Sequence, residues 1–193
     1  MSGKNYVDPN YRFIAAYQEV NARITQRQQS LGLYVTLTAS LLAGLLALHS
    51  GNAQRSVPVE WLVFGFPVTS LCLAFLNYKT ERAITNLRAF LSALEQLDGA
   101  HTRLPSYNTD PRWALGVNKV RRFHDIAAAV LAAGANGIGI GVVAQLYPER
   151  LRQDVILFPL LLAGAIASVL ALLIIPRWSY LPAPLALEET LHD

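Results

Sequence analysis

Four apolar segments alternate with polar stretches along this chain of 193 residues. They span residues 31–48, 59–77, 126–146 and 155–175 and, apart from Glu60 at an edge, contain no Asp, Glu, Lys, Arg or His. Each is close to the roughly 20 residues that a helix needs to cross a bilayer core. The pattern predicts an all-α integral membrane protein. Its four transmembrane helices would form two hairpins within a single membrane domain, residues 1–193, with helical cytoplasmic extensions.

An amphipathic helix is expected over residues 8–30. Asp8-Pro9 is typical of a helix start, with a capping residue followed by proline at the first helical position. Apolar side chains then recur at steps of four, three and four residues, at Phe13, Tyr17, Val20 and Ile24, and so share one face. No proline separates this helix from the first apolar segment, which favours one continuous helix to about Leu48. Its apolar face would lie on lipid or pack against a partner.

The polar connection over residues 78–125 contains a second amphipathic helix, expected from Tyr78 to Leu97. Its apolar seam consists of Ile84, Leu87, Leu91 and Leu94. This seam spans about two heptads, which favours packing against Tyr17, Val20 and Ile24 over an extended coiled coil. A break follows over residues 98–108. Asp110-Pro111 then repeats the helix-start signal ahead of the third apolar segment.

Small residues form a stripe in the third apolar segment. Ala129, Ala133, Gly137 and Gly141 recur at four-residue steps, and Asn136 is the strongly polar side chain in the middle of this segment. Small side chains let helices approach closely inside a bilayer. The stripe therefore predicts close helix contacts, within one subunit or between subunits, and we expect a homo-oligomer. Asn136 would form an interhelical hydrogen bond or face a pore between subunits.

Basic residues are distributed unevenly between the connections. Thirteen of the 16 Lys and Arg residues lie in residues 1–30, 78–125 and 176–193, whereas the connections at 49–58 and 147–154 hold only Arg55, Arg150 and Arg152. Loops rich in Lys and Arg remain cytoplasmic. The distribution predicts a multi-pass protein of the bacterial inner membrane, with the central connection, the tail at 176–193 and both termini in the cytoplasm.

No catalytic or cofactor-binding motif is present in the sequence. The four histidines are dispersed and Cys72 is the only cysteine, so neither a metal site nor an enzyme is predicted, and no cofactor is expected. The net charge is +3, but the basic residues flank apolar segments, which favours lipid headgroups as partners over nucleic acid. Arg121, Arg122 and His124 form a charged cluster beside the third segment. They would anchor its topology or contact an anionic ligand or a headgroup.

The stretch YRFIAAYQEVNARITQRQQSLGLYVTLTASLLAGLLAL, residues 11–48, resembles bacterial SLATT-type proteins. The resemblance extends over about the first hundred residues: a helical lead, two close membrane helices and an amphipathic helix. The second hairpin departs from that plan. The family is associated with membrane effectors of nucleotide-signalling and antiphage defence systems. The resemblance implies an oligomeric membrane effector or pore, controlled through its cytoplasmic helices by a nucleotide or a cytoplasmic protein. The alternative is a membrane scaffold or assembly protein that recruits a cytoplasmic partner.

Overall fold

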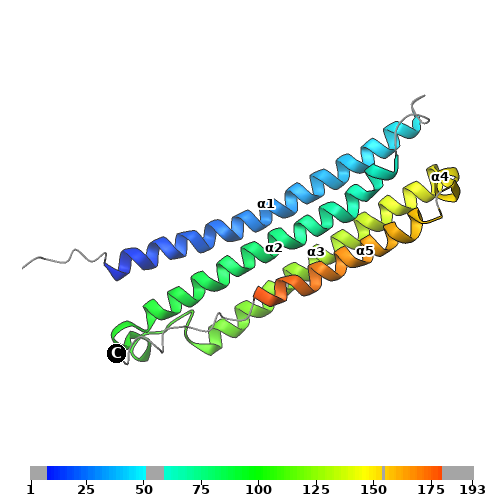
Figure 1. The fold of residues 1–193 in the computed structure, drawn as a ribbon. Helices are drawn as coiled ribbons and strands as arrows, with labels where there is room; N and C mark the ends of the chain where they lie inside the picture. The colour runs from blue at the N-terminus through cyan, green and yellow to red at the C-terminus, as the bar shows by residue number, and fades with distance from the viewer. Residues whose placement is uncertain (1–7, 51–58, 154, 180–193) are drawn as a thin grey trace, which may run out of the picture.

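The computed structural model describes residues 8–50, 59–153 and 155–179, and these residues form helices and turns without any strand. Four long helices dominate: α1 (Pro9–Ser50), α2 (Val59–Glu95), α3 (Pro111–Leu146) and α5 (Leu157–Ile174) (Figure 1). The shorter elements are the helix α4 (Pro148–Gln153) and the 3-10 helices η2 (Leu97–Thr102) and η3 (Ile175–Ser179). Each long helix has the length and apolar content needed to cross a membrane. The all-helical class is thus confirmed, as is the presence of four helices that are long and apolar enough to span a membrane.

The long helices form an elongated bundle. α1 packs along α2, while α5 packs against both α2 and α3. In Figure 1, α1 and the α3–α5 pair lie on opposite sides of α2, and α1 and α3 run in the same direction. α2 is therefore the central helix, and the interior face of α2 meets each of the other three.

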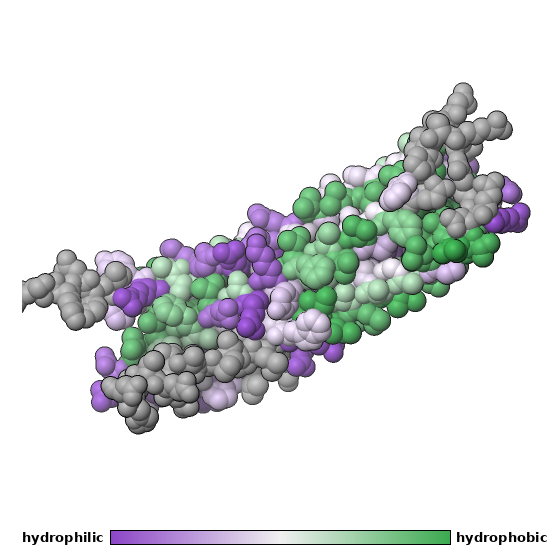
Figure 2. Space-filling model, viewed as in Figure 1, coloured by the Kyte–Doolittle hydropathy of each residue, from purple (hydrophilic) through white to green (hydrophobic). Residues whose placement is uncertain are grey.

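The bundle has an apolar half and a polar half. The apolar half consists of residues 31–50, 59–77, 126–146 and 157–174, and the polar half of residues 9–30, 78–95 and 111–125. Figure 2 shows hydrophilic side chains gathered toward one end and a mainly hydrophobic surface toward the other. α1, α2 and α3 each pass through both halves without interruption, whereas α5 is confined to the apolar half. The expected helix over 78–97 is thus the continuation of the second apolar segment, with Pro67 inside one helix.

Local chemistry accounts for where the helices begin. The Asp8 carboxylate accepts a hydrogen bond from the Asn10 backbone N–H at 2.8 Å, and Asp110 accepts one from the Arg112 N–H at 2.9 Å. Both aspartates cap a helix whose first residue is proline, as predicted. Between α2 and α3 the chain turns at Asp98 and Gly99, whose φ angles are 53° and 70°. The expected turn after residue 147 contains α4.

Two apolar clusters fill the apolar half. The middle cluster joins four helices through Tyr34, Leu73, Ala74, Ala128, Ala129, Ala132 and Leu172. The terminal cluster, farther from the polar half, consists of Leu45, Val59, Val63, Phe66, Val143, Tyr147, Leu157 and Leu161. The Tyr147 hydroxyl donates to the Leu45 carbonyl at 2.8 Å, which ties α3 to α1 at this end.

In the polar half, α1 and α2 meet through a third cluster. Ala16, Val20 and Leu91 are buried, with Phe13, Ile24 and Leu87 packed around them. Ile84 is also buried and Leu94 is half-buried. Tyr17 lies outside the packed face: its side chain is 54% exposed. It follows Ala16 by about 100° around the helix, which turns it away from α2.

Candidate functional site

Polar side chains follow the interior face of α2 from the polar half into the apolar half. Ser70, Asn77, Glu81 and Thr85 are all buried. Their spacing of seven, four and four residues places them on one face of the helix. We call these four residues the polar row. Burial of polar groups is costly unless they are hydrogen-bonded, so each member requires a partner or another reason for its position.

Glu81 is the centre of a charged layer that joins three helices. Its carboxylate is fully buried and pairs with Arg27 of α1 and Arg121 of α3. Arg121 Nε donates to Glu81 Oε2 at 2.6 Å, and Arg121 Nη2 donates to the Thr85 hydroxyl at 2.9 Å. The layer consists of Arg27, Glu81, Thr85 and Arg121. It lies on the polar side of the boundary between the two halves.

The three residues predicted to contact an anion do not act together. Arg121 is buried and bound to Glu81, whereas Arg122 is exposed. Consecutive helical residues point about 100° apart, so the two guanidinium groups leave α3 in different directions. His124 is half-buried, and its Nε2 has no hydrogen-bond partner among the described residues. Of the three, Arg122 is the cation left on the surface for a headgroup or other anion.

Asn77 occupies the polar row one turn from Glu81. Its side chain is fully buried, and neither amide atom has a hydrogen-bond partner within the described part of the chain. An unsatisfied buried amide costs about 1–3 kcal/mol. Folding alone therefore does not account for an asparagine at this position.

Farther into the apolar half, Ser70 links three helices. Its hydroxyl lies 3.1 Å from the Tyr34 hydroxyl of α1 and accepts a bond from Asn136 Nδ2 of α3 at 2.9 Å. Asn136 Nδ2 also donates to the Ala132 carbonyl, but Asn136 Oδ1 has no partner among the described residues. Beyond Ser70 the interior consists of the terminal cluster. The polar row thus ends at Ser70, and the apolar side chains of the terminal cluster fill the interior beyond it.

The small-residue stripe of α3 is divided between interior and surface. Ala129 lies in the middle cluster, whereas Ala133, Gly137 and Gly141 are exposed. A side chain at Gly137 or Gly141 would meet no atom within 4 Å. A groove of about 310 Å³ runs beside the stripe between α3 and α5. Its lining consists of Ala133, Asn136, Gly137, Ile140, Leu162, Ala165, Ile166, Val169 and Leu170. We call it the α3–α5 groove.

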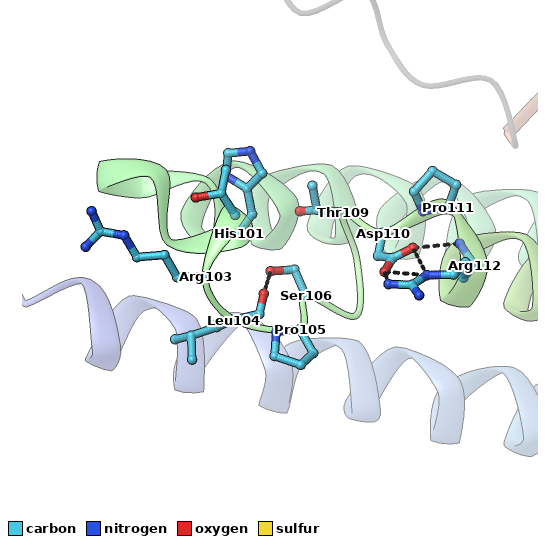
Figure 3. Close-up of a pocket in the computed structure, with 10 residues that line it drawn as sticks. His101, Arg103, Leu104, Pro105, Ser106, Thr109, Asp110, Pro111 and Arg112 are labelled. Atoms are coloured by element: carbon cyan, nitrogen blue, oxygen red, sulfur yellow. Dashed lines mark hydrogen bonds and ion pairs between the residues drawn. The ribbon is translucent and has the colours of Figure 1, made fainter.

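A second cavity, of about 450 Å³, lies at the turn between α2 and α3 (Figure 3). Arg112 lines it but is paired with Asp110, with 2.6 Å between Nη2 and Oδ2. These hydrogen bonds hold the pKa of Asp110 below its usual value. Arg103 points away from this ion pair in Figure 3. The cavity therefore offers fewer converging charged side chains than the charged layer does. It is the weaker candidate site.

Sequence reasoning missed Arg27, Glu81, Asn77 and Ser70 as interior groups. Glu81 lies in a strongly basic stretch and was not distinguished from a surface residue. One signal in the sequence could have identified them: the polar positions of α2 recur at steps of seven and four residues, which places them on one face of the helix. In the described ranges, no cluster of three or more His, Cys, Asp or Glu side chains could hold a metal ion. The arrangement instead couples helices through charge.

Comparisons with known proteins do not assign a family. No family model matches the chain, and no curated protein or solved structure shows a significant similarity to it.

Proposed function

We propose that this protein is a non-enzymatic, homo-oligomeric effector of the bacterial inner membrane, whose membrane helices are controlled through its cytoplasmic helices. The observation that carries the proposal is the fully buried Glu81, which binds Arg27 and Arg121 from two other helices. α1, α2 and α3 continue through this layer without a break. A displacement of the polar half therefore moves the membrane-spanning part of the same helices.

The polar row supports an effector role over a purely structural one. Polar groups at membrane depth are costly and mark functional positions by default. Asn77 and Asn136 Oδ1 are buried without a partner in the described structure, and the terminal cluster closes the interior beyond Ser70. A rearrangement that opens this cluster would connect the polar row with the far side of the membrane. Pore formation within or between subunits belongs to this proposal.

The distribution of Lys and Arg supports placing both termini and the α2–α3 connection in the cytoplasm. The charged layer then lies near the inner surface of the membrane. A nucleotide or a cytoplasmic protein is the class of signal that the polar half would receive.

Membrane potential and growth after induced expression in bacteria test the proposal. The unmodified protein should depolarise the membrane and arrest growth. Asn77→Leu, which removes an unsatisfied amide from the core, should accumulate to the same level and lose this effect. Asn86→Leu is the matched control, because Asn86 is an exposed residue of the same helix. Equal depolarisation by the unmodified protein and Asn77→Leu would remove the polar row from the mechanism.

A scaffold role is the second candidate, and one feature of α1 favours it. Tyr11, Ile14 and Tyr17 recur at three-residue steps and are each more than half exposed. This surface suits a cytoplasmic protein partner. The scaffold function would be supported if the unmodified protein left the membrane potential unchanged and captured a cytoplasmic protein that Ile14→Asp fails to capture.

A further inference from the structure

The middle of the side of α1 that faces away from the bundle consists of small residues, flanked by the exposed Leu33 and Leu46. Thr36 follows the buried Tyr34 by two residues, about 200° around the helix, and so lies opposite the packed face. All members of this surface are exposed, and we call it the small face of α1: Gly32, Thr36, Ala39, Ser40, Ala43 and Ala47. Helices that associate inside membranes do so through small and hydroxylated residues. The small face is therefore suited to another helix.

A complementary surface lies on the other side of α2. The lining of the α3–α5 groove combines small residues of α3, including Ala133 and Gly137, with the larger side chains of Ile140, Leu162 and Ile166. Asn136 lines it and is only 2% exposed, and Asn136 Oδ1 lacks a hydrogen-bond partner among the described residues. A residue of the groove lining thus carries an unsatisfied acceptor, which is buried in apolar surroundings. Its occupant should supply a hydrogen-bond donor.

The two surfaces lie at the same depth. Tyr34 and Asn136 both bond to Ser70, which sets them level with each other. Eleven residues farther along each helix, Leu45 and Tyr147 are joined as well, so α1 and α3 keep this register. Thr36 is about 3 Å along the axis from Tyr34. A rotation about the membrane normal, which preserves depth, can therefore bring Thr36 of one copy to Asn136 of another.

We infer that a second copy of this chain places the small face of its α1 in the α3–α5 groove, with the Thr36 hydroxyl donating to Asn136 Oδ1. The inference rests on the homo-oligomer of the proposed function and names its interface. Within one copy, the Thr36 hydroxyl donates to the Gly32 carbonyl at 3.1 Å. When the hydroxyl rotates toward the neighbouring copy, this carbonyl keeps its helical backbone hydrogen bond and remains satisfied. The incoming α1 runs parallel to α3.

The symmetry of the assembly follows from this contact. The contact joins two different surfaces, one on α1 and one between α3 and α5, so each copy offers one surface to each neighbour. In Figure 1 the α1 ribbon and the α3–α5 pair lie on either side of α2. Such a head-to-tail interface forms a ring when the rotation closes. Because the contact preserves depth, the ring axis is the membrane normal.

Disulfide cross-linking in native membranes tests the interface in a Cys72→Ser background. Thr36→Cys combined with Gly137→Cys should give an oxidation-dependent ladder of dimers, trimers and larger species on denaturing gels. Either substitution alone should leave monomers. Thr36→Cys with Ile126→Cys is the matched control: Ile126 is exposed on the same side of α3, eleven residues or about 16 Å from Gly137, and should give no ladder.

Removing the hydroxyl tests the hydrogen bond. Thr36→Val should reduce the oligomeric fraction in mild detergent several-fold, while Thr36→Ser should retain it. Dimers from Thr36→Cys alone, without a ladder from the pair, would overturn the head-to-tail interface. Native mass spectrometry of the unmodified protein separates the two claims. Monomers alone would contradict the proposed homo-oligomer. Oligomers without the Thr36–Gly137 ladder would contradict only the interface inferred here.

Discussion

Glu81 can remain charged in the bundle because two arginines approach it from neighbouring helices. An isolated carboxylate in an apolar interior is costly and takes up a proton. Arg27 and Arg121 each pair with one carboxylate oxygen, and Thr85 accepts a further hydrogen bond from Arg121. Replacing a whole buried ion cluster by apolar residues is often neutral for stability, whereas removing one member is not. The layer therefore constrains helix geometry more than it adds stability.

Glu81→Gln should destabilise the protein by roughly 3–5 kcal/mol, because it removes the buried carboxylate that pairs with both Arg27 and Arg121. Thermal unfolding in detergent would measure the change. Glu149→Gln is the control: Glu149 belongs to an exposed ion pair with Arg152, whose loss should change stability by less than about 1 kcal/mol. Equal melting temperatures for both variants would contradict the structural role of the charged layer.

Two glycines of α3 should respond differently to the same substitution. A methyl group at Gly139 would lie 2.8 Å from a Phe66 ring carbon, whereas one at Gly137 would meet nothing within 4 Å. Gly139→Ala should therefore cost about 1–3 kcal/mol through overpacking. Gly137→Ala should stabilise the monomer by up to about 1 kcal/mol through helix propensity. Unfolding of both variants under monomeric detergent conditions checks the sign of each effect.

At the scale of the elements, the contact between α1 and α2 in the polar half depends on a small apolar cluster. Leu91→Asp should lower the free energy of unfolding by about 3 kcal/mol, since Leu91 is buried and an aspartate there would have no partner in the cluster. Phe90→Asp, at an exposed position of the same helix, is the control and should melt like the unmodified protein. If both variants had the same melting temperature, the third cluster, between α1 and α2, would not contribute to the stability of the fold.

Helix positions were largely predictable from the sequence, whereas the interior contacts were not. Apolar periodicity and the Asp8-Pro9 and Asp110-Pro111 caps predicted where α1 and α3 begin. The sequence did not predict that the second apolar segment and residues 78–95 form one continuous helix. The change from apolar to amphipathic character there resembles the end of one helix and the start of another. Glu81 pairs with residues 54 and 40 positions away, and local periodicity carries no information about such partners.

For the whole molecule, labelling with a membrane-impermeant thiol reagent tests the proposed orientation in a Cys72→Ser background. Gly51→Cys, outside the described residues, should react in intact spheroplasts, because the connection at 49–58 is expected outside the cell. Asp98→Cys, in the turn between α2 and α3, should react only after permeabilisation. The reverse pattern would place the polar half outside the cell and remove the cytoplasmic control of the proposed function.

The charged layer also restricts how a stimulus can travel along the molecule. Arg27 and Arg121 are bound to one carboxylate, which fixes the axial positions of α1 and α3 relative to α2. Sliding one helix by a single turn, about 5.4 Å, would separate an arginine from Glu81 and break an ion pair of this buried carboxylate, which is costly. A piston stroke of α1 alone is therefore disfavoured. The three helices should instead tilt together as one rigid body. The apolar contacts farther along the helices would then rearrange to accommodate the change in angle.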